Sequence, residues 1–171
     1  MLVGCHVSIR GGYAEAAVRA ARLGCTAFQY FPKNPRALGL KAFDRADARR
    51  CAAYSRERGI VSIAHAPYPV NLAAERPEQR ERMTESLLND LDIAEACGSI
   101  GVVVHFGVYK GADPLAGYRL ILDALNAVLA RWTGEAKLLI ENQAGDHAPM
   151  GTTIEELVQI RRLCAHPERV A

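Results

Sequence analysis

The sequence predicts an α/β protein in which short strands and longer helices alternate around a parallel sheet. Two observations support this prediction. Apolar runs rich in β-branched residues alternate with stretches of helical period, and the helical stretches end at glycines that lead directly into the next run. The chain has 171 residues, half of them hydrophobic. We therefore expect a single domain over residues 1–171 with one core.

The five predicted strands are short, and the later ones are continuously apolar. Gly101-Val-Val-Val104 and Leu138-Leu-Ile140 show no alternation of polar and apolar residues. That pattern is typical of parallel strands covered on both faces. In chain order the predicted strands are Leu2 to Cys5, Ala27 to Tyr30, Ile60 to Ala64, Ile100 to Val104 and Lys137 to Ile140.

The helical stretches between these runs have recognisable ends and faces. Thr152-Thr-Ile-Glu155-Glu156 offers two overlapping capping boxes for a last helix that runs to about Cys164. Four glycines stand where a left-handed residue would end a helix: Gly24, Gly59, Gly98 and Gly134. Apolar residues recur at three- and four-residue steps in two stretches, at Met83, Leu87, Leu91 and Ala94, and at Leu115, Tyr118, Leu122, Leu125, Leu129 and Trp132.

Two arrangements of such repeated units remain open, an open doubly wound sheet and a closed eightfold barrel. Periodicity alone does not choose between them. Gly11-Gly12 follows the first strand without the G-x-G-x-x-G spacing of a dinucleotide site, and the chain has no phosphate-binding P-loop. Both absences argue against a nucleotide-binding open sheet.

Composition excludes several classes of protein. The five cysteines are odd in number and contain no C-x-x-C pair, which argues against a disulfide framework and favours a reducing, cytoplasmic environment. No basic leader precedes an apolar segment, and no run approaches the roughly 18 apolar residues of a membrane span. The net charge of +2 is too small to indicate nucleic acid by itself. Any DNA-binding prediction must therefore come from local residues.

Reactive side chains gather where the predicted strands end. His65, His105 and Glu141 follow three consecutive strands, and the carboxyl ends of parallel strands form one mouth. A lone histidine is more often structural, but two imidazoles and a carboxylate together suit zinc, manganese or iron with an open position for water. The carboxylate can also bridge to a second metal ion. We expect His6 and Asn142 to support these ligands or to contact substrate.

Five segments in order resemble motifs of the endonuclease IV family. They are Gly4-Cys-His-Val-Ser8-Ile-Arg-Gly-Gly12, Ala27-Phe-Gln-Tyr-Phe-Pro-Lys-Asn-Pro-Arg36, His65-Ala-Pro-Tyr68-Pro-Val-Asn71-Leu72, Val103-Val-His105 and Glu141-Asn142-Gln-Ala-Gly145. The resemblance covers essentially the whole chain. It implies a TIM-type (β/α)8 barrel of the xylose-isomerase-like kind, of which this chain supplies about five βα units.

The resemblance also implies an activity, which is metal-dependent hydrolysis of the DNA phosphodiester 5′ to an abasic site in base excision repair. His65, His105 and Glu141 correspond to ligands of a site with up to three zinc ions, where Glu141 is catalytic and bridges two metals. Manganese or iron are the alternative metals. The partner implied is double-stranded DNA with abasic sites, with no membrane and no protein partner, and the complete enzyme is expected to be a monomer.

The DNA-binding residues implied by the resemblance lie on two loops. Arg36 and Tyr68 correspond to residues that enter the minor groove and hold a bent duplex with the abasic nucleotide turned out. Lys33 and Arg36 are candidates for phosphate contacts. Asn71 belongs to the same motif as Tyr68 and is assigned to DNA binding with it.

The chain departs from the family pattern near the mouth. After His105 it reads Phe106-Gly-Val-Tyr109 where the family has P-G-x-H, Gln143 stands where threonine is usual, and Asp146-His-Ala-Pro-Met150 replaces a glycine-richer loop. These changes leave the expected ligands intact but put the substrate in doubt. Two alternatives stay open: a sugar isomerase or epimerase of the related xylose-isomerase-like barrels, and an inactive DNA-binding fragment.

The length of the chain carries an expectation of its own. A closed barrel needs eight strands and typically about 250 residues. His166-Pro-Glu-Arg-Val-Ala171 is interpreted as the approach to a sixth strand. We expect the five-unit polypeptide alone to have open sheet edges that favour association, and to cleave abasic DNA negligibly.

Overall fold

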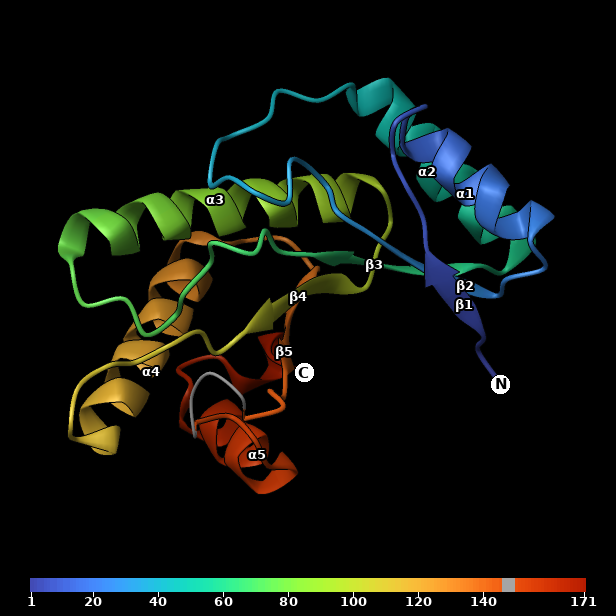
Figure 1. The fold of residues 1–171 in the computed structure, drawn as a ribbon. Coiled ribbons are helices and arrows are strands. Elements are labelled where there is room, and N and C mark those ends of the chain that lie inside the picture. Colours follow the sequence, from blue (N-terminus) through green and yellow to red (C-terminus); the bar gives the residue numbers. More distant parts are fainter. Residues whose placement is uncertain (146–149) are drawn as a thin grey trace.

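The computed structural model describes residues 1–145 and 150–171, and it contains one five-stranded sheet with five α-helices (Figure 1). The elements in chain order are β1 (Gly4–His6), α1 (Tyr13–Arg22), β2 (Ala27–Tyr30), α2 (Arg45–Arg58), β3 (Val61–His65), α3 (Pro77–Ala96), β4 (Gly101–His105), α4 (Pro114–Arg131), β5 (Lys137–Glu141), α5 (Ile154–Leu163) and the short 3-10 helix η1 (Pro167–Arg169).

The order of the strands decides between the two arrangements that the sequence left open. All four strand pairs are parallel, and the order in the sheet, β1-β2-β3-β4-β5, is the order in the chain. A doubly wound sheet reverses its direction of growth at a switch point, whereas a barrel wall adds each strand on the same side. Figure 1 shows the helices following one another around one side of the strands, each in contact with the next. The expected five units of a TIM-type barrel are confirmed.

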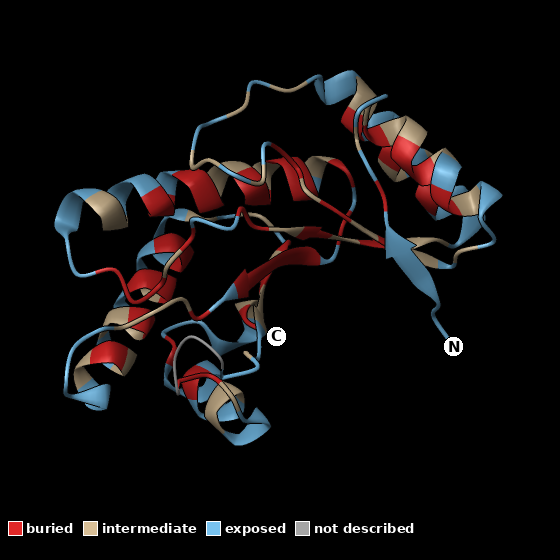
Figure 2. Cartoon of the chain, in the orientation of Figure 1, coloured by how far each residue is buried: buried red, intermediate tan, exposed pale blue. Residues whose placement is uncertain are grey.

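The core lies between the outer face of the sheet and the helices. Phe28 and Tyr30 are buried in β2, while the alternate residues Ala27 and Gln29 are only partly covered. The expectation that the later strands are covered on both faces therefore holds for the buried run of β4 and fails for β5, where Leu138 is buried but Leu139 and Ile140 are only partly covered (Figure 2). The inner face of β1 to β3 borders a hollow of about 510 Å³.

Three of the four predicted helix-ending glycines behave as expected, with φ of 75° at Gly24, 63° at Gly59 and 69° at Gly98. Gly134 does not have a positive φ, and the expectation for it is wrong. Helix α4 ends at Arg131, and Trp132 is extended and donates its ring N–H to the carbonyl oxygen of Ala136 at 2.9 Å. A β-carbon at residue 134 would collide with the Trp132 ring, so Gly134 serves that close approach.

The predicted boundaries are close to those observed. Strand β1 begins and ends later than predicted, and β3, β4 and β5 each extend one residue further than predicted, so that His65, His105 and Glu141 are their last residues. The second of the two possible capping boxes starts α5, where Thr153 Oγ1 accepts from the Glu156 amide at 3.2 Å and the Glu156 carboxylate accepts from the Thr153 amide at 2.8 Å.

The last two residues lie beside β5. Val170 forms a parallel bridge with Leu138, and Ala171 exchanges backbone hydrogen bonds with Leu138 and Ile140 at 2.9 and 2.8 Å. The end of the described chain therefore runs along the free edge of β5, and the expected sixth strand stays a prediction. Among the described residues, no helix combines the length and apolar character that crossing a membrane requires.

Candidate metal centre

Three neighbouring strands end in the three residues that the sequence singled out as ligands. Nε2 of His65 lies 3.2 Å from Nε2 of His105. Oε2 of Glu141 lies 3.4 Å from Nε2 of His105 and 3.7 Å from Nε2 of His65. One donor atom from each residue falls within 4.8 Å of the others. Two imidazole nitrogens and a carboxylate oxygen at this separation can bind one divalent ion together.

The imidazole of His65 is held in the tautomer that a metal requires. Its Nδ1 lies 2.7 Å from the carbonyl oxygen of Ala66, and because a carbonyl can only accept, Nδ1 carries the proton. The lone pair is then on Nε2, which faces His105 and Glu141. Burial lowers the pKa of His65 and so favours the neutral ring that binds metal. His105 and Glu141 are about half exposed, which leaves the cluster open on one side.

An aromatic ring that sequence reasoning did not assign separates the cluster from β1. The ring centroid of Phe31 lies 4.8 Å from that of His6, 5.2 Å from that of His65 and 5.2 Å from that of Tyr68. His6 also contacts Gln29 through Nδ1 at 3.3 Å. His6 therefore borders the cluster across Phe31. The sequence held one signal that could have identified Phe31: it directly follows β2, at the end of the strands where the other candidate residues lie.

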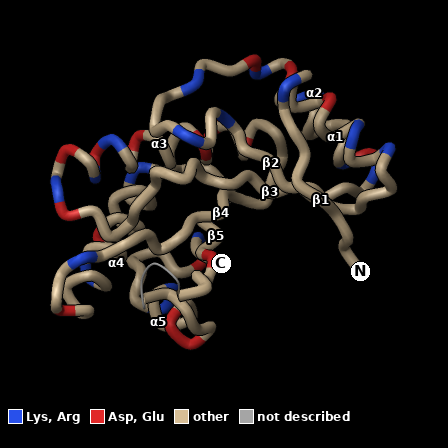
Figure 3. The backbone as a smooth tube through the Cα atoms, in the orientation of Figure 1, with Lys and Arg blue, Asp and Glu red and all other residues tan. Residues whose placement is uncertain are grey.

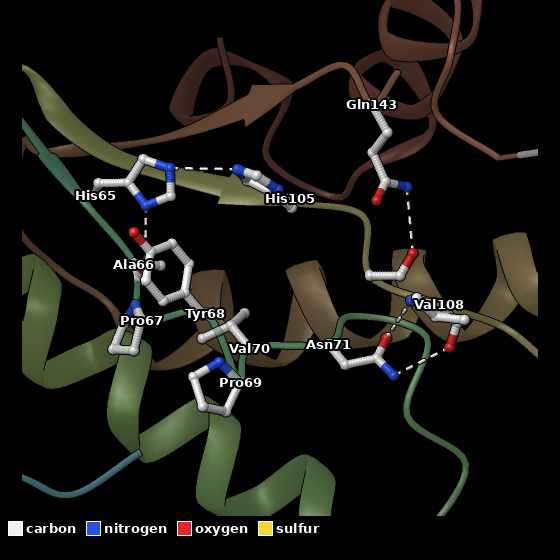
Figure 4. Close-up of a pocket in the computed structure, with 11 residues that line it drawn as sticks. His65, Ala66, Pro67, Tyr68, Pro69, Val70, Asn71, His105, Val108 and Gln143 are labelled. Carbon is white, nitrogen blue, oxygen red and sulfur yellow. Dashed lines mark hydrogen bonds between the residues drawn. The ribbon is translucent and has the colours of Figure 1, made fainter. Parts of the chain in front are cut away.

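A hollow of about 210 Å³ adjoins the two histidines. Figure 4 shows it bounded by His65, His105, the segment 66–71, Val108 and Gln143. The amide of Asn71 joins the two loops around it: Nδ2 donates to the carbonyl oxygen of Val108 at 3.0 Å, and Oδ1 accepts from the Val108 amide at 3.0 Å. Asn71 thus has a structural role between the two loops, and its expected contact with DNA stays a prediction.

The residues that depart from the family pattern have structural roles here. Phe106 is fully buried, and Gly107 has a φ of 85° and lies so close to Asn71 that a β-carbon would collide with it. Gln143 Nε2 donates to the carbonyl oxygens of Gly107 and Met150 at 3.2 and 2.9 Å. These contacts connect the loops after β4 and β5. Residues 146–149 of the remaining departure lie outside the described residues.

The expected DNA-binding residues divide into two groups. Tyr68 is 67% exposed and Arg36 is exposed, with no ion pair to any described residue. Lys33 is only 5% exposed: its Nζ lies 3.1 Å from Oδ1 of Asp90 and donates to the carbonyl oxygen of Ser86 at 2.7 Å. This burial contradicts the expected phosphate contact of Lys33. Asn142 is exposed beside Glu141 and makes no hydrogen bond with the described part of the chain.

Comparison with known proteins identifies a family and two curated relatives of the same name. A family model described as xylose isomerase-like TIM barrel matches residues 17–170. The chain is 43% identical over 171 residues to a protein named probable endonuclease 4 from Symbiobacterium thermophilum, covering 100% of this chain and 62% of the relative. A protein of the same name from Methanoculleus marisnigri is 36% identical and is covered to 57%. The chain thus spans about three fifths of the length of these curated relatives.

Solved structures give a similar result. Endonuclease IV from Thermus thermophilus matches with a TM-score of 0.76 and 36% identity, over 92% of this chain and 58% of that one. D-psicose 3-epimerase from Clostridium cellulolyticum matches with a TM-score of 0.70 and 13% identity, over 98% of this chain and 62% of that one. The second match shows the fold alone. The resemblance to endonuclease IV noted from the motifs is confirmed by these similarities.

Proposed function

The chain belongs to the xylose isomerase-like TIM barrel family, and on this premise we propose that it contributes the metal-binding mouth of an endonuclease that hydrolyses the DNA phosphodiester 5′ to an abasic site. The observation that carries the proposal is the cluster of His65, His105 and Glu141, whose donor atoms face one another at the carboxyl ends of adjacent strands. The similarity to proteins named endonuclease 4 supports the choice of reaction.

The donor set fits a divalent metal, and zinc suits two imidazoles and a carboxylate, with manganese and iron as the alternatives. When bound, such an ion supplies a Lewis acid and lowers the pKa of coordinated water. His65 offers a preset lone pair on Nε2, because its Nδ1–H is occupied by Ala66. Glu141 is half exposed, so its carboxylate has an oxygen free for a second cation in the proposed site with up to three zinc ions.

Residues on the loops would orient the substrate. Tyr68 is exposed beside the histidines, and its ring is supported by Phe31. An exposed aromatic at the edge of a metal centre can stack on a base or fill the gap that an abasic nucleotide leaves. Arg36 is exposed on the adjoining loop and offers a guanidinium to the groove or to a phosphate.

The alternative is a sugar isomerase or epimerase. The matched epimerase has only 13% sequence identity, so it supports the fold and not the reaction. An exposed Tyr68 and an exposed Arg36 at the mouth favour an extended, anionic substrate over a small neutral sugar.

The test measures both the zinc content of the protein and its cleavage of DNA. Zinc bound per chain is measured by mass spectrometry after dialysis, and cleavage is measured on an end-labelled duplex with one abasic site. Because the chain spans three fifths of its relatives, cleavage is assayed with and without the remaining part of the Symbiobacterium relative added as a separate polypeptide. We expect about one tightly bound zinc that His65→Ala removes, and cleavage 5′ to the lesion in the supplemented sample only. Zinc binding that survives His65→Ala, or epimerisation of a ketose without DNA cleavage, would refute the proposal.

A further inference from the structure

A second hollow lies beside the metal centre, between the loop that follows β2 and the amino-terminal half of α3. Its volume is about 870 Å³. We call it the arginine groove, and the lining residues that matter here are Arg36, Pro69, Arg76, Glu78, Gln79 and Arg82. Figure 3 shows charged residues of both signs along this half of α3.

Helical spacing places the polar groups of α3 on the groove side. Arg76, Gln79 and Arg82 follow one another in steps of three, so they share one face of the helix. Glu81 belongs to another face, where its carboxylate pairs with Arg131 of α4 at 2.7 Å. Arg76 and Arg82 thus lie on the groove side, while the carboxylate of Glu81 is paired on another face.

The three arginines of the groove keep their charge available. Arg36, Arg76 and Arg82 are all exposed, and none forms an ion pair with a residue that the structure describes. Glu78 is the only acidic residue that lines the groove within the described chain. Helix α3 also begins here without a side-chain cap, so its first turn adds partial positive charge.

The groove adjoins the hollow beside the candidate metal centre. Pro69 lines both the arginine groove and the hollow beside His65 and His105. Arg76 and Gln79 line a third hollow as well, in which Lys110 adds another exposed cation and Glu75 one acid. A row of donors therefore leads from the metal centre along the start of α3.

We propose that the arginine groove binds consecutive phosphates of the DNA backbone beside the metal centre. Guanidinium groups bind phosphate oxygens through paired hydrogen bonds, and a side-chain amide such as that of Gln79 can donate to them. Separate cations along an open groove match an extended polyanion better than a single small anion. This inference rests on the proposed function for the identity of the polyanion, but the contact itself requires neither a metal nor a lesion.

The experiment measures binding of an undamaged, fluorescently labelled duplex in EDTA over a series of salt concentrations. Arg76→Ala/Arg82→Ala is compared with Arg19→Ala/Arg56→Ala. The control pair removes two exposed arginines from the last turns of α1 and α2, at the opposite end of the strands. Each lost phosphate contact lowers the slope of log K against log salt by about 0.9. We expect the groove variant to lose roughly two units of slope and the control pair to lose none.

Three results would overturn the proposal: an unchanged slope in the groove variant, an equal loss in the control pair, or inhibition by inorganic phosphate as strong as by duplex, which would indicate a single-anion site. Circular dichroism of both variants checks that they remain folded. Because binding is measured without metal on intact DNA, a failure of cleavage 5′ to abasic sites leaves this result unaffected. Normal cleavage together with an unchanged slope would refute DNA binding by the arginine groove and leave the proposed endonuclease function standing.

Discussion

The backbone amide of Tyr68 donates a hydrogen bond to the carbonyl oxygen of Pro35 over 2.8 Å. This bond joins the loop after β3 to the loop after β2, immediately beside Arg36. The Phe31 ring reinforces the connection, since it lies 5.2 Å from the ring of Tyr68. The two side chains expected to meet DNA are therefore carried by one connected surface next to the candidate metal centre.

Replacing Tyr68 or Arg36 by alanine should weaken binding of abasic duplex while changing the unfolding free energy by no more than about 0.5 kcal/mol, because both side chains are exposed. Fluorescence anisotropy gives the affinity and urea denaturation gives the stability. Leu23→Ala and Arg56→Ala are matched controls, since both residues are exposed at the opposite end of the strands. A large loss of stability with unchanged affinity would show that the side chains are structural.

Glu141→Gln should reduce zinc affinity by more than the roughly 10–100-fold that loss of an outer hydrogen-bond partner costs, since a neutral amide replaces an anionic ligand of the same shape. Isothermal titration with zinc measures the change. Glu57→Gln, an exposed position on α2, serves as the control. Full zinc affinity in Glu141→Gln would exclude the carboxylate from the site.

The buried pair of Lys33 and Asp90 should behave as a structural ion pair. At a pH above the raised pKa of Asp90, Lys33→Met leaves the Asp90 carboxylate buried and charged without a partner, which costs roughly 3–5 kcal/mol of unfolding free energy. Lys33→Met/Asp90→Leu removes both charges and should recover most of that loss. Chemical denaturation of Lys33→Met, Asp90→Leu and the double variant completes a thermodynamic cycle. Equal stability of Lys33→Met and the parent chain would mean that the pair contributes nothing.

Burial raises the pKa of Asp90 to about 7, although Lys33 opposes the rise. The unfolded value is about 3.9, so between these two pH values the folded state holds a proton that the unfolded state has released. The contribution of Asp90 to stability is therefore full at acidic pH and falls as the pH rises from about 4 to about 7. Asp90→Asn should flatten this part of the profile in urea denaturation. If Asp90→Asn shows a slope of the same size, the pH dependence of stability comes from another titrating group.

Much of the fold was accessible from local sequence features, because apolar runs, capping residues and helix-ending glycines act over a few residues. The candidate ligands were accessible for a related reason: His65 and Glu141 directly follow apolar runs, and parallel strands bring such positions together. The burial of Lys33 could not be predicted from the sequence, because its partner Asp90 lies on α3, far away in the chain. A lysine in a polar loop is expected to be solvated unless a helix packs against it. The contact of Asn71 with Val108 was not predicted for the same reason, since Val108 comes from the loop after the next strand.

The side-chain amide of Asn71 acts like one more peptide group, with a donor and an acceptor paired to the N–H and C=O of Val108. The two loops that border the candidate metal centre thereby lose conformational freedom when the chain folds, and not when a ligand arrives. Ordering a loop during binding would subtract from the affinity, about 1–2 kcal/mol for each backbone residue that is fixed. Because Asn71 orders both loops during folding, substrate binding does not carry this entropic cost. More of the interaction energy between substrate and protein then contributes to the affinity.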